Sequence, residues 1–325
     1  MQAGFIEQLR ALVGPTGVVT QQEELRTYEC DGLTNYRVVP VAVVLPDAVE
    51  QIPAIVRACH EAGVPFVARG SGTGLSGGAL PVDGGIVLSL SRLTRILEVD
   101  LPNQRVLVEP GVFNLQVTQR VSGDGFFFAP DPSSQSVCSI GGNVAENSGG
   151  AHCLKYGFTV THVTALEAVL PDGSVVHLGG EAPDAPGYDL AGVFVGSEGT
   201  LGVATRVTLR IVRRPEVIQT LIAAFPSTDH AGAAVSAIIA AGILPAAIEM
   251  MDRLALDAAE AAVHPGYPDC QALLLVELDG PEAEVADGMG RVRALCEESG
   301  AGEQRLAQSD AERAAFWKGR KAAFA

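Results

Sequence analysis

The sequence lacks the closely spaced cysteines that hold an iron–sulfur cluster or a zinc ion. Among its 325 residues there are six cysteines, and no two of them form a C-x-x-C pair. Such metal centres need thiolates at short, regular spacing. We therefore expect reduced, mostly buried thiols and no metal site held by this chain. The six cysteines are Cys30, Cys59, Cys138, Cys153, Cys270 and Cys296.

Basic charge is also scarce. The chain has 22 lysine and arginine residues against 38 aspartate and glutamate residues, a formal net charge of −16 at pH 7. No cluster of lysine or arginine offsets this balance, which repels phosphate backbones and anionic lipid surfaces. Nucleic acid and anionic membrane surfaces are therefore excluded as partners.

The sequence shows neither an export signal nor a membrane-spanning segment. Met1 is followed by no basic region and no apolar core of the signal-peptide type. The longest apolar stretch, residues 231–244, is rich in alanine, contains Ser236 and stops at Pro245. It suits a buried helix better than a bilayer. We expect a cytoplasmic protein that is peripheral to a membrane only where partner subunits bring it there.

The length and the 47% hydrophobic content predict two domains, because single cores usually stop growing near this size. Residues 41–45 read as a buried strand. Asp47 and Glu50 then stand at capping-box spacing before an apolar stripe of helical period that contains Pro53. We expect a helix there, kinked at the proline, and a second strand at residues 64–68.

The middle of the chain is rich in predicted strands. Residues 95–100 and 105–109 form one predicted hairpin, and residues 166–170 and 175–178 form another around Asp172-Gly173. A short helix at residues 112–121 separates them. Residues 192–213 are expected to contribute further strands.

A new pattern begins at Arg214-Pro215, which marks a plausible domain boundary. A strand at residues 218–225, a helix at 228–241, a strand at 246–250 and further helix follow in turn. This alternation predicts an α+β domain with a ferredoxin-like order of elements.

Gly72, Gly74 and Gly77 form a G-x-G-x-x-G pattern directly after the strand at residues 64–68. In a Rossmann fold this pattern opens a helix whose N-terminus holds a dinucleotide diphosphate. Residues 77–85 are instead full of glycine and proline and lead into another strand, which excludes an NAD-dependent Rossmann dehydrogenase. A loop that wraps backbone amides around a diphosphate fits better, and the expected ligand is a phosphorylated cofactor.

A second glycine-rich stretch comprises residues 139–143 and 147–150. In isolation both are tight turns within a β domain, and residues 130–133 are a turn fixed by prolines. Glycine pairs on both sides of Asn147, whose amide both donates and accepts, favour contact with a cofactor. His152 and Cys153 are adjacent but cannot supply a zinc site alone, so we interpret them as structural.

Five segments, in this order, resemble one known family. They are residues 66–78 (FVARGSGTGLSGG), 129–134 (APDPSS), 141–150 (GGNVAENSGG), 153–157 (CLKYG) and 196–202 (GSEGTLG). The set resembles the FAD-linked oxidases of the vanillyl-alcohol oxidase and p-cresol methylhydroxylase type. Within that superfamily it is most similar to the glycolate oxidase D subunit and to FAD-dependent D-lactate and D-2-hydroxyglutarate dehydrogenases.

The resemblance implies an α+β fold. Its parts are a two-subdomain FAD-binding domain of the p-cresol methylhydroxylase (PCMH) type and an incomplete ferredoxin-like α+β cap domain. The organisation it implies is an N-terminal segment at residues 1–40, the FAD-binding domain at 41–214 and the cap domain at 215–325.

The resemblance also implies which residues contact FAD. We expect the flavin to be bound without a covalent link, because covalent relatives often attach it through a histidine in the first glycine loop, where this chain offers Thr73. The expected cofactor contacts are Arg69, Gly70, Ser71, Gly72, Thr73, Gly74, Leu75, Ser76, Pro130, Asp131, Ser133, Gly141, Gly142, Asn147, Gly149, Gly150, Tyr156, Gly157, Glu198, Gly199 and Val203.

The implied activity is oxidation of a small D-2-hydroxy acid, such as glycolate, D-lactate or D-2-hydroxyglutarate, to the 2-oxo acid by hydride transfer to flavin N5. In the segment Trp317-Lys318-Gly319-Arg320, the resemblance assigns Arg320 to the substrate carboxylate, which a planar guanidinium with parallel donors fits well. The electron acceptor and any partner subunits are left open.

One departure from the family concerns a divalent metal. The family's H-x-G-D-G-N-x-H motif does not occur between Met1 and Ala325. The resemblance therefore implies that this chain lacks the metal site and oxidises its substrate poorly on its own. The alternative is a non-catalytic FAD-binding module, or a fragment completed by another polypeptide, and turnover with an artificial acceptor separates the two.

Overall fold

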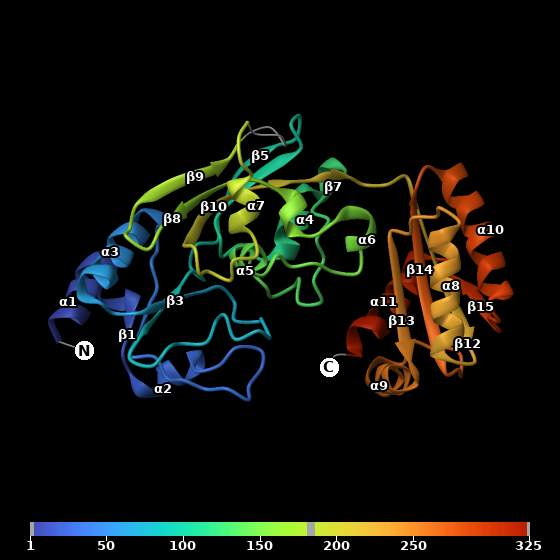
Figure 1. The fold of residues 1–325 in the computed structure, drawn as a ribbon, viewed down its shortest axis with the longest axis horizontal. Helices are drawn as coiled ribbons and strands as arrows, with labels where there is room; N and C mark the ends of the chain where they lie inside the picture. The colour runs from blue at the N-terminus through green and yellow to red at the C-terminus, as the bar shows by residue number, and fades with distance from the viewer. Residues whose placement is uncertain (1–2, 181–185, 324–325) are drawn as a thin grey trace. The chain divides into compact units, whose positions relative to one another are not determined.

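The computed structural model describes residues 3–180 and 186–323 and divides the chain into two compact units (Figure 1). Unit 1 comprises residues 1–149 and 158–213, and unit 2 comprises residues 150–157 and 214–325. The chain thus passes between the units three times. Residues 150–157, which the sequence analysis placed in the FAD-binding domain, pack in unit 2.

The first part of unit 1 is a four-stranded sheet with the order β1-β2-β4-β3. Strands β2, β4 and β3 are parallel, and β1 pairs with β2 in the antiparallel sense. Helices α1 and α3 share a core with the sheet, so the N-terminal residues belong to this unit. The elements are α1 (Ala3–Val13), β1 (Val18–Val19), α2 (Gln22–Leu25), β2 (Ala42–Val44), α3 (Ile52–Ala62), β3 (Phe66–Arg69) and β4 (Ile86–Ser89).

Two details of α3 correct the sequence analysis. Gln51 closes the start of the helix, because its side-chain oxygen accepts hydrogen bonds from the backbone amides of Asp47 (2.8 Å) and Ala48 (3.1 Å). Pro53 lies in the first turn, where its missing N–H removes no helical hydrogen bond, so the predicted kink was wrong. The capping residue is therefore Gln51 and not Glu50.

The second part of unit 1 is a five-stranded antiparallel sheet with the order β5-β6-β10-β8-β9. Both predicted hairpins are confirmed, since β5 pairs with β6 and β8 pairs with β9. The elements of this part are β5 (Ile96–Asp100), β6 (Arg105–Val108), α4 (Asn114–Val121), β7 (Phe126–Phe127), α5 (Ile140–Glu146), β8 (Val163–Val169), β9 (Val175–Gly179), α7 (Leu190–Phe194), β10 (Val203–Arg210) and β11 (Val212–Arg213).

Two of these helices were not expected. Helix α5 includes residues 140–143 of the second glycine-rich stretch, which in isolation reads as tight turns, and α7 extends into the region after residue 192 where strands were predicted. Ser139 caps α5 by accepting a hydrogen bond from the amide of Gly142 (3.3 Å). A Cβ atom on Gly141 would lie 2.8 Å from Pro110, so close packing explains a glycine that helix propensity disfavours.

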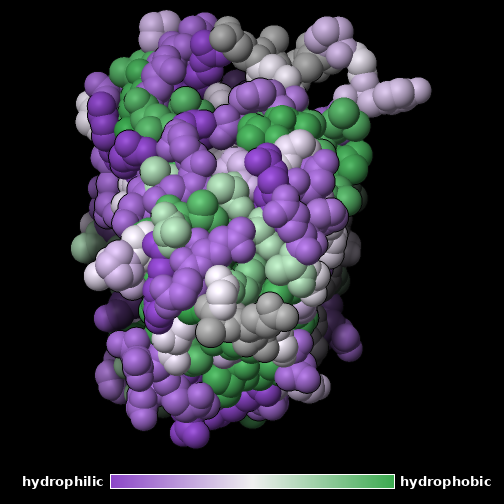
Figure 2. Space-filling view, turned by 90° about the vertical axis from the view of Figure 1, so that its left-hand side faces the viewer, coloured by the Kyte–Doolittle hydropathy of each residue, from purple (hydrophilic) through white to green (hydrophobic). Residues whose placement is uncertain are grey.

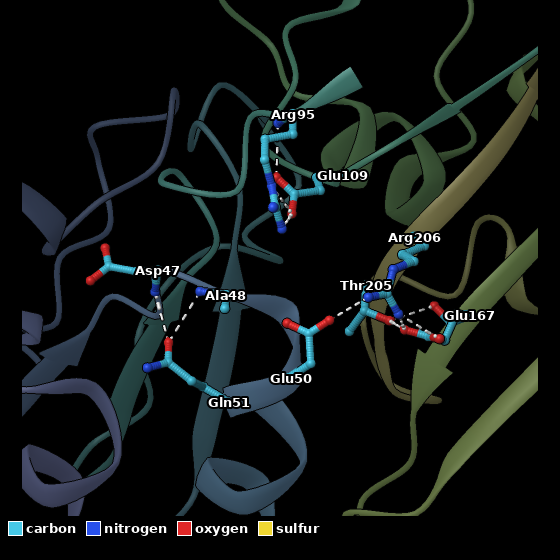
Figure 3. Close-up of polar contacts among 9 residues, drawn as sticks. All are labelled: Asp47, Ala48, Glu50, Gln51, Arg95, Glu109, Glu167, Thr205 and Arg206. Carbon is cyan, nitrogen blue, oxygen red and sulfur yellow. Dashed lines mark hydrogen bonds and ion pairs between the residues drawn. The ribbon is translucent and has the colours of Figure 1, made fainter. Parts of the chain in front are cut away.

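Charged side chains connect the two parts of unit 1 (Figure 3). Arg206 on β10 donates to both carboxylate oxygens of Glu167 on β8 (2.7 and 2.8 Å) and to Glu50, which directly precedes Gln51 (2.5 Å). Nearby, the buried carboxylate of Glu109 accepts three hydrogen bonds from Arg95. The contact between Arg206 and Glu50 therefore joins the start of α3 to the second sheet.

Unit 2 contains a four-stranded antiparallel sheet of order β13-β14-β12-β15, which is the ferredoxin-like arrangement (Figure 1). Helices α8 and α10 pack on one face, and α9 and α11 pack on the other. The elements are α6 (Cys153–Tyr156), β12 (Val217–Phe225), α8 (Thr228–Ala240), β13 (Ala247–Asp252), α9 (Arg253–Val263), β14 (Ala272–Gly280), α10 (Glu282–Glu298), β15 (Gln304–Leu306) and α11 (Asp310–Ala322).

Within residues 3–180 and 186–323, every helix is too short or too polar to cross a membrane. On the face drawn in Figure 2, hydrophilic residues are interspersed with small apolar patches. The remaining short elements are 3-10 helices: η1 (Pro15–Gly17), η2 (Arg26–Tyr28), η3 (Val49–Gln51), η4 (Ser122–Asp124) and η5 (Thr159–His162).

Candidate functional site

The first glycine loop, residues 70–78, follows β3 directly. Gly72 has a φ of +69°, and a Cβ atom there would lie less than 3.0 Å from the guanidinium of Arg69. Arg69 is buried inside the loop, where its Nη1 donates to the carbonyl of Ala79 (3.0 Å). The loop therefore closes around an arginine, and only glycine fits opposite it.

Contacts from the preceding segment fix the shape of this loop. The Asp31 carboxylate accepts a hydrogen bond from the amide of Gly77 (3.0 Å), and the amide of Gly32 donates to the carbonyl of Gly74 (2.9 Å). Among the described residues, no protein atom accepts a hydrogen bond from the amides of residues 71–76. Such a run of amide donors without a protein acceptor is the type of nest that binds a phosphate or diphosphate.

Helix α5 forms the second wall of the site. A Cβ atom on Gly70 would lie less than 3.0 Å from the Ser139 hydroxyl that caps this helix. In the same helix, the buried side chain of Asn143 accepts a hydrogen bond from Asn114 (3.0 Å). The glycine loop and the start of α5 are thus in direct contact.

The third wall comes from residues 194–204. Glu198 and Gly199 both have left-handed backbone conformations, with φ of 53° and 75°. The amides of Gly196 and Glu198 donate to the carbonyls of Val144 (2.8 Å) and Ala145 (2.9 Å) near the end of α5. This turn is therefore attached to α5 by backbone hydrogen bonds.

The three walls enclose a cavity of about 320 Å³, within the size range of small-molecule sites. Many of the predicted cofactor contacts line it. They are Arg69, Gly70, Ser71, Gly72, Thr73, Gly74, Leu75, Gly141, Gly142, Glu198, Gly199 and Val203.

Other predicted contacts do not line this cavity. Ser76 donates to the Glu146 carboxylate (3.4 Å), Pro130 accepts from Asn114 (3.0 Å), and Asn147 accepts from the amide of Val160 (2.9 Å). Gly150, Tyr156 and Gly157 belong to unit 2, where Tyr156 donates to Asp279 (2.5 Å). The full set outside the lining is Ser76, Pro130, Asp131, Ser133, Asn147, Gly149, Gly150, Tyr156 and Gly157.

Sequence reasoning missed several lining residues, including a group on α5 and at its N-cap. Ser139 and the helical residues Asn143, Val144, Ala145 and Glu146 line the cavity. The capping serine ahead of a glycine pair was an available signal for this helix. A glutamate beside a phosphate site gives no such signal, because its charge opposes the ligand.

Glu146 is the main electrostatic peculiarity of the cavity. Burial, followed by the nearby Glu198 and Asp31 carboxylates, raises the pKa of Glu146, while the hydrogen bond from Ser76 acts in the opposite direction. Its carboxylate would lie 3.3 Å from a Cβ atom on Gly74. An acidic group with a raised pKa therefore faces the glycine loop.

In unit 2, one face of the sheet carries a buried carboxylate with several donors. Glu277 on β14 is 4% exposed and accepts hydrogen bonds from His152 (2.9 Å), Thr220 (2.5 Å) and Trp317 (2.7 Å). Burial alone would raise the pKa of Glu277, but the hydrogen bonds from these three residues outweigh it and lower the pKa. The carboxylate is therefore charged at neutral pH.

Two further carboxylates lie on this sheet: Asp279 on β14 and Glu249 on β13. Asp279 binds the Lys155 ammonium and the Tyr156 hydroxyl, and burial and this contact raise the pKa of Tyr156. Arg320 on α11, the residue predicted to bind the substrate carboxylate, donates from Nε to Glu249 on β13 (2.8 Å). Sequence reasoning found Arg320 but missed Glu249, Glu277 and Asp279.

A metal site is not evident. Within the described ranges, no group of three or more histidine, cysteine, aspartate or glutamate side chains is arranged to hold a metal ion. The six cysteines are free thiols.

Comparison with known proteins identifies the family. The FAD binding domain family matches residues 40–179, and the family of C-terminal domains of FAD linked oxidases matches residues 214–325. The glycolate oxidase subunit GlcD of Escherichia coli (strain K12) is 50% identical over 317 residues, 97% of this chain and 64% of that protein. GlcD of Bacillus subtilis (strain 168) is 40% identical over 319 residues, 98% of this chain and 68% of that protein.

The chain therefore belongs to the FAD-linked oxidases, a class of oxidoreductases, and the resemblance seen in the sequence is confirmed. It spans 64% of the length of the Escherichia coli relative. A solved structure of p-cresol methylhydroxylase with substrate bound superimposes with a TM-score of 0.79 at 20% identity, covering 98% of this chain and 68% of that chain. This match confirms the PCMH-type fold.

Proposed function

We propose that the cavity of unit 1 holds FAD, with its diphosphate on the amides of residues 71–76. The observation that carries the proposal is this run of amides without a protein acceptor, on a loop where glycine leaves the backbone accessible. The matching FAD binding domain family supports the identity of the cofactor. Arg69, buried behind the loop, adds positive charge.

We further propose that the flavin is not covalently attached. No histidine in the described part of the chain lines the cavity, and its one lining cysteine, Cys138, is buried against Asn143 (Sγ to Nδ2, 3.4 Å). Acid precipitation of the FAD-loaded protein should leave all yellow colour in the supernatant. Flavin that stays on the pellet would contradict the proposal, and Cys138→Ser would then test the attachment point.

For the whole protein we propose oxidation of a D-2-hydroxy acid, such as glycolate, D-lactate or D-2-hydroxyglutarate, to the 2-oxo acid. The names of the relatives, glycolate oxidase subunit and D-lactate dehydrogenase, support this substrate class. FAD, when bound, supplies a hydride acceptor at N5. Arg320 would bind and orient the substrate carboxylate through its planar guanidinium, whose geometry matches that of a carboxylate.

The activity is tested by anaerobic addition of substrate to the FAD-loaded protein. With this chain alone, D-lactate should bleach the flavin slowly or not at all, and L-lactate should not bleach it. We expect faster bleaching when the remaining C-terminal part of the Escherichia coli relative is fused to the chain. If FAD binds but no D-2-hydroxy acid bleaches it in either form, the second candidate, a non-catalytic FAD-binding module, is the better account.

The names of the relatives and the free cysteines also bear on the partner subunits and the cellular location. Because two relatives are named as subunits, we propose that this protein works with partner subunits that take electrons from the reduced flavin. Six free cysteines agree with a reducing, cytoplasmic compartment.

A further inference from the structure

The feature of interest is the set of donors around Glu277 in unit 2. They come from three different elements: His152 precedes α6, Thr220 lies on β12 and Trp317 lies on α11. Each hydrogen bond ends on one buried, charged carboxylate. Charge-assisted hydrogen bonds of this kind are stronger and more directional than neutral ones.

Helix α11 is attached to the sheet at two such carboxylates. Trp317 donates to Glu277 on β14, and Arg320, three residues later, donates to Glu249 on β13. Residues three apart lie on the same side of a helix. In the sheet, Ala247 is opposite Glu277, so Glu249, two residues further along β13, points to the same face. The two carboxylates thus attach one side of α11 to the sheet.

We propose that Glu277 is a positioning residue for substrate: by holding Trp317 it sets α11 so that Arg320, oriented through Nε by Glu249, meets the substrate carboxylate. The inference rests on the proposed role of Arg320. A guanidinium binds a carboxylate well only when its plane is aligned with that group. A displacement of about 1 Å at a reacting or binding group can reduce function by up to about 100-fold.

The same strand offers a matched control. Asp279 lies two residues after Glu277 on the same face, and it also binds side chains of the 150–157 segment, Lys155 and Tyr156. Among the described residues, Asp279 forms no hydrogen bond or ion pair with α11. If Glu277 acted only by fastening that segment, loss of Asp279 would have the same effect.

The experiment measures binding of oxalate, a planar carboxylate that cannot be oxidised by hydride loss, to the FAD-loaded protein by calorimetry. We expect Glu277→Gln and Trp317→Phe to weaken oxalate binding about tenfold or more. Asp279→Asn should leave it unchanged, and Arg320→Ala should abolish it. Circular dichroism and the bound flavin spectrum establish that each variant is folded.

A second measurement uses the fact that Trp317 is the only tryptophan in the chain. The single indole N–H signal in a ¹H–¹⁵N spectrum should shift in Glu277→Gln and stay in place in Asp279→Asn. Oxalate should shift the same signal in the wild-type protein.

The outcomes distinguish the proposed role of Arg320 in substrate binding from the proposed role of Glu277 in positioning it. If the wild-type protein does not bind oxalate, or Arg320→Ala binds it equally well, the assigned role of Arg320 is wrong and the inference fails with it. If Arg320→Ala loses binding while Glu277→Gln retains wild-type affinity, the role of Arg320 stands and the positioning role of Glu277 is overturned. Equal losses in Glu277→Gln and Asp279→Asn would also overturn it.

Discussion

Gly70 and Ser139 lie so close together that a Cβ atom on Gly70 would be less than 3.0 Å from the Ser139 hydroxyl. That hydroxyl caps α5 by accepting a hydrogen bond from the amide of Gly142 (3.3 Å). The glycine loop and the second wall of the cavity are therefore coupled at one point.

We predict that Gly70→Ala costs about 1 kcal/mol of stability, because the serine must rotate away and the helix loses its cap. In the background of Ser139→Ala the same substitution should cost much less, since the cap is already absent. Urea unfolding of the four proteins in this double-mutant cycle measures the coupling. Additive effects would show that the two residues do not meet.

Glu277 should make stability depend on pH in the acid range. Its pKa is lowered from 4.5 on folding, so the unfolded chain binds the proton more readily than the folded one. The stabilisation is complete above about pH 4.5 and is lost as pH falls through the lower, folded pKa. Glu277→Gln should cost about 1–3 kcal/mol at neutral pH.

The corresponding measurement is the melting temperature of both proteins between neutral and acid pH. The difference between them should shrink as pH falls below 4.5. A constant difference would mean that Glu277 is not ionised in the folded protein.

Glu146 should oppose binding of FAD in its charged form. Because Glu146 lies opposite Gly74, a diphosphate on the glycine loop would meet a second negative group whenever this carboxyl is ionised. Unit charges about 10 Å apart repel by roughly 1.7 kcal/mol at an effective dielectric constant near 20, which is more than tenfold in affinity. FAD affinity should thus fall as pH rises above 4.5 through the raised pKa of Glu146.

Calorimetric titration with FAD across this pH range tests the effect. Glu146→Gln should bind FAD more tightly at neutral pH and with a flatter pH profile, whereas the exposed Glu282→Gln in α10 should behave like wild type. Weaker FAD binding in Glu146→Gln at neutral pH would contradict the prediction and would indicate that the carboxylate accepts a hydrogen bond from the cofactor instead.

Local signals explain why part of the fold could be predicted. The two hairpins and the strand before the first glycine loop follow from apolar alternation bounded by turn residues. Helix α5 was missed because two adjacent glycines disfavour a helix. Its first turn packs against Pro110, which lies 31 positions before Gly141 in the sequence, so no local signal reveals the contact. Tertiary packing, rather than local helix propensity, therefore accounts for the helical conformation of α5.

In the candidate site, too, some residues could be predicted from local sequence and others could not. The glycine loop can be read locally, because positive φ and close approach require glycine at fixed positions. The contact between Trp317 and Glu277 joins residues 40 positions apart, and nothing near either residue indicates the other. A single glutamate in the apolar run of β14 was a sign of a buried charge, but its partners depend on the sheet.

The most direct test of the central claim is FAD binding by Gly74→Asp. This substitution places a Cβ atom and a negative charge on the proposed diphosphate loop, 3.3 Å from the Glu146 carboxylate. Gly123→Asp adds the same charge elsewhere in unit 1, at an exposed glycine with no atom within 4 Å of its Cβ position. We predict that Gly74→Asp folds by circular dichroism but binds no FAD in calorimetry, while Gly123→Asp binds it like wild type. Wild-type affinity in Gly74→Asp would contradict the account, because the phosphates would then lie elsewhere.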